Sequence, residues 1–198
     1  MKSAILGVLL AAFAIPCAAL TELEEGIRLQ ERKDYGKAAV AFQKAALKGS
    51  GEARRRLGLL YYHGQGVKQD NAKAVALFEM AAEGGDIESA SDLGMMYEFG
   101  MGVTLDESLA VKWYARAAEL GDPGSQYRAS EMYYKGRGVA RDRIEAAKWW
   151  TLAMARGGDF ARSIRAGVES AEAKLTAEEL AEGRRRAADW TVAREAKK

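Results

Sequence analysis

The sequence repeats itself every 36 residues. Three segments, which begin at Leu57, Leu93 and Ala129, share an apolar run, a Gly-x-Gly-Val turn, an aspartate and a second apolar run. A fixed period of this length is typical of proteins in which one supersecondary unit is stacked on the next. One unit of helix, loop and helix cannot bury its apolar face alone, so we expect the stacked units to share a continuous core.

Glycine, alanine and aromatic residues recur at fixed places in each unit. The small residues Gly58, Gly94 and Ser130 predict close helix packing, which must offset their low helix propensity. The paired glycines end the first helix and allow positive φ angles. The aspartate of each unit, such as Asp70, precedes the second helix and can cap its free amides. Alanine and aromatic residues three and four apart form the apolar stripe of that helix, so we expect Trp113 to be buried.

The segments on either side of the three units extend the pattern. Residues 20–50 stay in phase, because Asp34 lies 36 residues before Asp70, but the loop between their helices is four residues shorter. They predict a fourth helix pair with a tight turn. Residues 159–198 lose the aromatic positions and end in a long charged segment that begins with the capping-box pattern Thr176-x-x-Glu179. A polar terminal helix of this kind can cover the open end of a stack.

We therefore predict an all-α fold, a right-handed solenoid of stacked helix pairs with a C-terminal capping helix. We divide the chain into a separate N-terminal segment, residues 1–19, which is discussed below, and the parts of the solenoid. These parts are residues 20–50, 51–86, 87–122, 123–158 and 159–198. The expected helices cover residues 22–32, 35–48, 52–63, 71–84, 87–99, 107–120, 124–135, 143–156, 160–173 and 176–194.

The three central units resemble Sel1-like repeats. The shared pattern is Leu-Gly-x-x-Tyr-x-x-Gly-x-Gly-Val, then Asp, Lys-Ala, an aromatic residue, Ala-Ala and Gly. The third unit departs from it, with Ala129-Ser130 in place of Leu-Gly and Met154 in place of the second alanine. The first unit, with its shorter loop, resembles a tetratricopeptide repeat. The resemblance implies a non-catalytic adaptor that holds a protein or peptide on a curved surface, although a fold does not by itself give a function.

The first nineteen residues have the layout of a secretory signal. Lys2 precedes an apolar run over residues 4–20, which contains Pro16 and small residues before a predicted cleavage between Ala19 and Leu20. Alternatives are an uncleaved anchor helix or a lipid on Cys17, whose preceding proline is a poor match to lipid-anchor signals. Cleavage predicts a periplasmic or secreted protein without stable membrane insertion.

The net charge and the residue composition argue against a nucleic-acid partner and against a catalytic function. Thirty Lys and Arg against 28 Asp and Glu leave a net charge of +2, without the basic excess of a nucleic-acid-binding protein. With one histidine, His63, and one cysteine inside the predicted signal, Cys–His catalysis and ordinary zinc sites lack their residues. We expect no metal or cofactor. The alternative is a carboxylate-dependent envelope hydrolase or cell-wall-binding enzyme, which would need converging acids in a pocket.

The resemblance also indicates where a partner would bind. In tetratricopeptide-like stacks the first helix of each pair lines the concave face, and we assign to that face the positions around the small residues that packing does not use. Aromatic and arginine side chains among them would dominate the binding energy, although Leu59 and Met95 could instead pack between repeats. We expect Tyr62, Phe99 and Tyr134 to contribute most. The predicted protein-binding residues are Arg55, Tyr62, His63, Met95, Glu98, Phe99, Tyr127, Glu131, Tyr134 and Lys135.

Overall fold

The computed structural model describes residues 17–196, and every regular element in that range is an α-helix. Residues 1–16, most of the predicted signal, lie outside this range; the predicted cleavage site Ala19–Leu20 falls in the first turn of α1. The helices are α1 (Cys17–Glu31), α2 (Tyr35–Leu47), α3 (Gly51–His63), α4 (Asn71–Glu83), α5 (Ile87–Phe99), α6 (Glu107–Glu119), α7 (Pro123–Lys135), α8 (Arg143–Ala155), α9 (Gly158–Glu172) and α10 (Ala177–Glu195).

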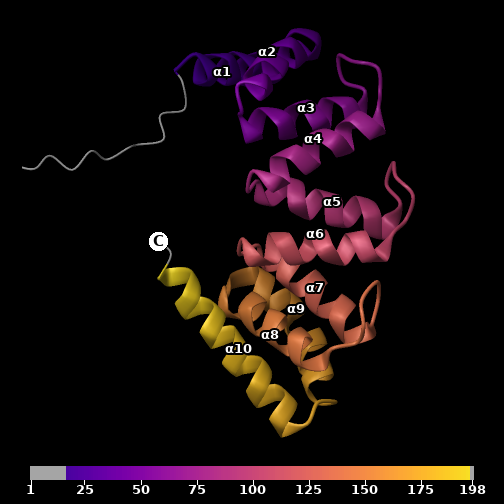
Figure 1. Ribbon diagram of the computed structural model, residues 1–198, viewed down its shortest axis with the longest axis vertical. Helices are drawn as coiled ribbons and strands as arrows, with labels where there is room; N and C mark the ends of the chain where they lie inside the picture. The colour runs from indigo at the N-terminus through magenta and orange to yellow at the C-terminus, as the bar shows by residue number, and fades with distance from the viewer. Residues whose placement is uncertain (1–16, 197–198) are drawn as a thin grey trace, which may run out of the picture.

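The helix pairs follow one another along the long axis of the molecule (Figure 1). α1 packs on α2, α3 on α4, α5 on α6 and α7 on α8, and each second helix also packs on the next first helix. This is the predicted all-α solenoid. The first helices form one layer, in which Arg55 of α3 pairs with Glu88 of α5 at 2.8 Å and Ser125 of α7 lies 3.1 Å from Ser91 of α5.

Nine of the ten helices begin and end within two residues of their predicted bounds, and eight of these nine begin directly after a residue whose side chain caps the helix. The Oδ1 atoms of Asp70 and Asp142 accept hydrogen bonds from the third backbone amide of α4 and α8, which satisfies amides that the helix leaves free. The predicted capping box of Thr176 and Glu179 is present. Only α1 differs, since it begins five residues earlier than predicted.

The small residues of each first helix make room for an aromatic ring. A Cβ atom added at Gly58 would lie 2.8 Å from the ring of Phe78, and one at Gly94 would lie 2.6 Å from the ring of Tyr114. The predicted close packing is therefore a contact between a ring and a backbone within one helix pair. These rings, with the buried alanines around them, form the core of each repeat.

The second glycine of each Gly-x-Gly turn joins neighbouring repeats. Gly66 and Gly138 both have positive φ angles, 69° and 67°. A side chain at Gly66 would overlap the backbone of Tyr35, and one at Gly138 would overlap the carbonyl of Glu107. Each loop thus lies directly against the start of the second helix one repeat earlier, a contact that the sequence does not reveal.

Two C-terminal helices close the stack. α10 lies along α8 (Figure 1), where Gly183 brings its backbone against Ala147 and Trp190 meets Trp149 edge to face at 6.3 Å between ring centroids. α9 packs Ile164 and Val168 into the core cluster of the third Sel1-like unit. The predicted capping role of the terminal helix is thus confirmed for α10.

Candidate functional site

The first-helix face, which we define as the outward-facing side chains of α3, α5 and α7, carries the predicted binding residues. On α5, Met95 and Phe99 are 39% and 54% exposed, and their spacing of four residues places them on one side of the helix. On α3, His63 is exposed, while Tyr62 packs partly on the core of the next repeat and meets His63 edge to face at 5.0 Å. Tyr62 and His63 thus lie at the end of the first helix of one repeat, and Met95 and Phe99 lie on the first helix of the next.

Arg55 takes part in a cluster of ion pairs between α3 and α5. Its guanidinium group lies 2.8 Å from the carboxylate of Glu88 and 3.7 Å from that of Asp86. Asp92 lies in the same cluster, and burial raises the pKa of its carboxyl group against a smaller lowering by Arg55. Glu88 and Asp86 raise that pKa further through like-charge repulsion. Arg55 therefore connects two repeats in addition to lying on the predicted face.

Replacing Asp92 by asparagine should stabilise the protein at neutral pH. Because the folded-state pKa of Asp92 is raised, its ionised form is disfavoured in the folded state, and the wild type loses stability as the pH rises through that pKa. Asparagine has no charge to bury. Urea unfolding should show the variant more stable than the wild type at pH 7, with a gain that shrinks as the pH falls toward 3.8, the ordinary pKa of the group. A gain that is independent of pH would contradict this cause.

Glu98 is buried, which corrects its predicted place on the binding face. Its side chain accepts a hydrogen bond from the Tyr114 hydroxyl at 2.9 Å and one from Arg137 at 3.0 Å, and the residue is 4% exposed. Arg137 also pairs with Glu107 at 2.7 Å. Burial, followed by the hydrogen bond to Glu98, raises the pKa of Tyr114. One carboxylate oxygen of Glu98 thus joins α5 to α6 within a helix pair, and the other joins this pair to the loop after α7.

In the third Sel1-like unit, α9 lies beside the predicted binding residues of α7. Tyr127 and Tyr134 pack in the same core cluster as Ile164 and Val168 of α9, and the Tyr134 ring lies 6.0 Å from that of Trp150. All four predicted residues of α7 line a cavity of about 170 Å³ between α7 and α9. They are Tyr127, Glu131, Tyr134 and Lys135. Tyr127, Glu131 and Tyr134 are therefore only partly exposed in this repeat, whereas Lys135 is exposed. Sequence spacing gave no sign of where α9 packs.

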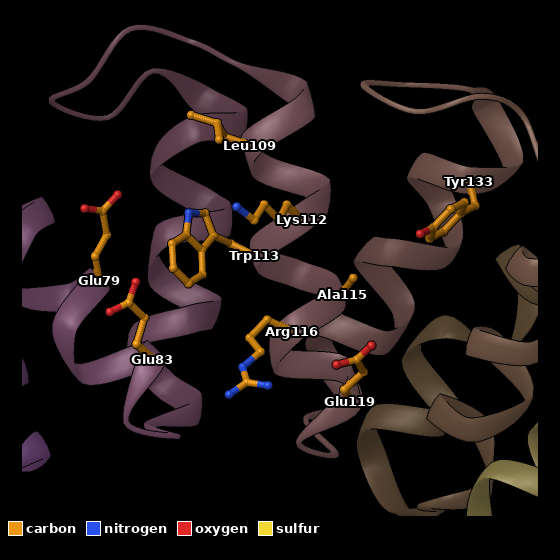
Figure 2. Close-up of a pocket in the computed structure, with 9 residues that line it drawn as sticks. All are labelled: Glu79, Glu83, Leu109, Lys112, Trp113, Ala115, Arg116, Glu119 and Tyr133. Carbon is orange, nitrogen blue, oxygen red and sulfur yellow. The ribbon is translucent and has the colours of Figure 1, made fainter.

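A larger groove lies on the second-helix face, the outer surface of α4, α6 and α8. It has a volume of about 730 Å³, and we call it the Trp113 groove. Figure 2 shows the indole ring of Trp113 projecting from α6 toward α4, with two glutamates on the α4 side and two basic side chains on α6. Its lining residues are Glu79, Glu83, Leu109, Lys112, Trp113, Ala115, Arg116, Glu119 and Tyr133.

Trp113 is only partly buried, which corrects its predicted place in the core. Its ring packs against the core cluster around Phe78, and its outer side lines the groove, where no helix of the described residues covers it. The equivalent Trp149 is 2% exposed, because α10 lies over it. The sequence does contain a signal for this groove: Glu79 and Glu83 on α4, like Lys112 and Arg116 on α6, are like-charge pairs four residues apart, which do not stabilise a helix by themselves.

Residues 17–196 contain no group of three or more His, Cys, Asp or Glu side chains placed to hold a metal ion. Over the same range, no helix is long and apolar enough to cross a bilayer.

Helix pairs stacked one on the next define an α-solenoid repeat protein. The profile of the Sel1 repeat matches residues 22–50, 51–86, 87–122 and 123–158. These segments make up more than half of the 198 residues, so the chain belongs to the Sel1 repeat family. The match includes residues 22–50, so the first unit, for which the shorter loop predicted a tetratricopeptide-like repeat, also matches the Sel1 repeat. Sel1 repeat proteins commonly act as protein-interaction scaffolds and are generally not catalysts.

Solved structures that are similar to this chain include two Sel1-type repeat proteins. A Sel1 repeat protein from Oxalobacter formigenes is 39% identical, with an alignment that covers 63% of this chain and 93% of that protein and a TM-score of 0.57. A protective antigen of uropathogenic Escherichia coli with an SLR fold is 27% identical over 86% of this chain and 46% of the antigen, with a TM-score of 0.51. No protein with a curated description matches the sequence.

Proposed function

We propose that this protein is an exported, non-catalytic adaptor that binds a segment of a partner protein on its first-helix face. The observation that carries the proposal is the exposure of Phe99 and Met95 on α5, at 54% and 39%. Tyr62, on the first helix of the preceding repeat, is also partly exposed. Large exposed apolar side chains that lie together on a soluble protein mark interaction sites. Aromatic residues among them supply much of the binding energy.

The packing of α9 supports a helical or extended protein segment as the occupant. In the third Sel1-like unit, the face of α7 holds apolar residues of α9, among them Val168 and Ala171. The neighbouring face of α5 presents Met95 and Phe99 without such a cover. A partner segment would extend over α5 and α3 the type of contact that α9 makes with α7. The coarse chemistry of the occupant is therefore apolar, with few charges at its centre.

Affinity capture from the native envelope fraction tests the proposal. Changing both Met95 and Phe99 to serine should abolish recovery of the partner, because these two changes remove the apolar centre of the surface. The matched control changes Leu47 and Val192 to serine, since these residues are even more exposed, at 80% and 68%, and lie off this face. Loss of the same partner from both variants, or from neither, would refute the assignment of the face.

Export is the second part of the proposal, and it is supported by the charged, apolar and small-residue layout of residues 1–19. Mass spectrometry of the protein from the periplasmic or secreted fraction should give a mature chain that begins at Leu20. An intact Met1 in that fraction, or a lipid on Cys17, would contradict cleavage at this site.

A further inference from the structure

The chain fills one helix-binding site on its own second-helix face. Trp190 of α10 meets Trp149 of α8, which is only 2% exposed. One turn further along α10, Arg194 donates a hydrogen bond to the Leu120 carbonyl at 2.6 Å and occupies the space that a side chain at Gly121 would need. We call this site the α10 seat. It consists of Trp149 on α8 and Gly121, which follows α6, the second helix of the preceding repeat.

The same two positions are open one repeat earlier. Trp113 and Gly85 precede Trp149 and Gly121 by one period of 36 residues. The outer part of Trp113 lines the Trp113 groove. Apart from Gly85 and its two chain neighbours, no atom of residues 17–196 lies within 4 Å of the place where a side chain at Gly85 would begin. The aromatic and glycine positions of the α10 seat thus recur without a helix over them.

Two positions that are apolar in the α10 seat carry charged side chains at the edge of the Trp113 groove. Arg116 and Glu119 stand one period before Leu152 and Ala155, which lie beside α10. Within residues 17–196, Arg116, Glu119 and Glu83 take part in none of the ion pairs, although such pairs are frequent elsewhere on the surface. A helix that binds here must therefore differ from α10 by bringing charges that complement this edge.

We propose that the Trp113 groove binds an amphipathic helix of a partner protein. The helix places an aromatic side chain against Trp113 and a basic side chain four residues later over Gly85, beside Glu83. An acidic side chain on the same helix faces Arg116. The spacing follows that of Trp190 and Arg194 in α10, whose guanidinium group lies 5.0 Å from the indole ring.

This site lies on the second helices, whereas the proposed adaptor surface lies on the first helices. The two can therefore be tested separately: the change of Met95 and Phe99 to serine should leave helix binding at the Trp113 groove intact. A failure of either proposal has no effect on the other.

A phage-displayed library of helices tests this inference directly. The helices are 19 residues long, as α10 is, and are selected against the full-length protein. We expect enrichment of an aromatic residue followed four positions later by arginine or lysine. The selected helices should bind the Trp113→Ala variant about tenfold more weakly, as expected for removal of a central aromatic contact. Val192→Ala, a change at a 68% exposed residue on α10, is the matched control and should leave binding unchanged.

Glu83→Lys keeps the test decisive if Trp113→Ala does not fold, because Glu83 is an exposed side chain. This reversal should weaken the selected helices severalfold, and a helix with glutamate in place of its basic residue should regain binding. Unchanged binding to both variants, or enrichment without the aromatic and basic pair, would overturn the proposal. So would sedimentation of the protein alone as a dimer that Trp113→Ala dissociates, since the occupant would then be a second copy of this chain.

Discussion

Replacing Trp149 by alanine should lower the free energy of unfolding by about 3–5 kcal/mol, the usual cost of deleting a large buried aromatic side chain. Trp149 is 2% exposed and lies in a cluster that α6, α7, α8 and α10 share. Its indole nitrogen has no hydrogen-bond partner among the described residues, so the loss is one of packing. The same change at Trp113 should cost about 1–2 kcal/mol, because only part of that ring leaves water on folding.

Urea unfolding monitored by circular dichroism measures both values under one set of conditions. The two tryptophans occupy the same position in successive repeats, so the comparison isolates the cover that α10 provides over Trp149. Equal losses at the two sites would show that Trp113 is as buried as Trp149 and would remove the open side of the Trp113 groove.

Gly138→Ala should be the most damaging of the loop substitutions, with a loss of about 3 kcal/mol or more. A positive φ angle costs a side-chain-bearing residue about 1–2 kcal/mol, and overpacking adds about 1–3 kcal/mol. At Gly138 the added methyl group would meet the backbone carbonyl of Glu107, which cannot rotate away as a side chain can. Two repeats would have to separate at this point.

Gly100→Ala is the matched control for this effect. Its φ angle is 66°, against 67° at Gly138, but the nearest atom to an added Cβ is 3.5 Å away, an ordinary contact. Thermal or urea unfolding should show a loss at Gly100 of about 1–2 kcal/mol, from backbone strain alone. If the two variants lost equal stability, the close contact between the loop and α6 would contribute nothing.

The fold could be predicted from the sequence because the same helix-capping and turn residues recur in each repeat. Aspartate caps such as Asp70 and Asp142 fix where the second helices begin, and Gly64 and Gly136, both in the left-handed region, end the first helices. What could not be predicted are contacts between distant segments. The overlap of Gly138 with Glu107 depends on how one repeat lies on the next, and a period in the sequence gives no such offset.

The site was predictable only where no other element intervened. Met95 and Phe99 are exposed as expected, because no helix among residues 17–196 covers α5 on that side. Tyr134 has the right position on its helix but lies under α9, whose sequence no longer follows the repeat. Glu98 occupies the same repeat position as Tyr134, but its side chain is buried and accepts a hydrogen bond from the Tyr114 hydroxyl. One position thus has different roles in different repeats, according to its partners.

The most direct test of the adaptor function is site-specific photocrosslinking in the native envelope. A photoreactive amino acid in place of Phe99 should give one defined adduct with a partner protein, and Met95→Ser in the same chain should strongly reduce it. The same amino acid in place of Val192, which is 68% exposed on α10, should give no such adduct. An adduct of equal yield at both positions, or at Val192 alone, would contradict binding on the first-helix face.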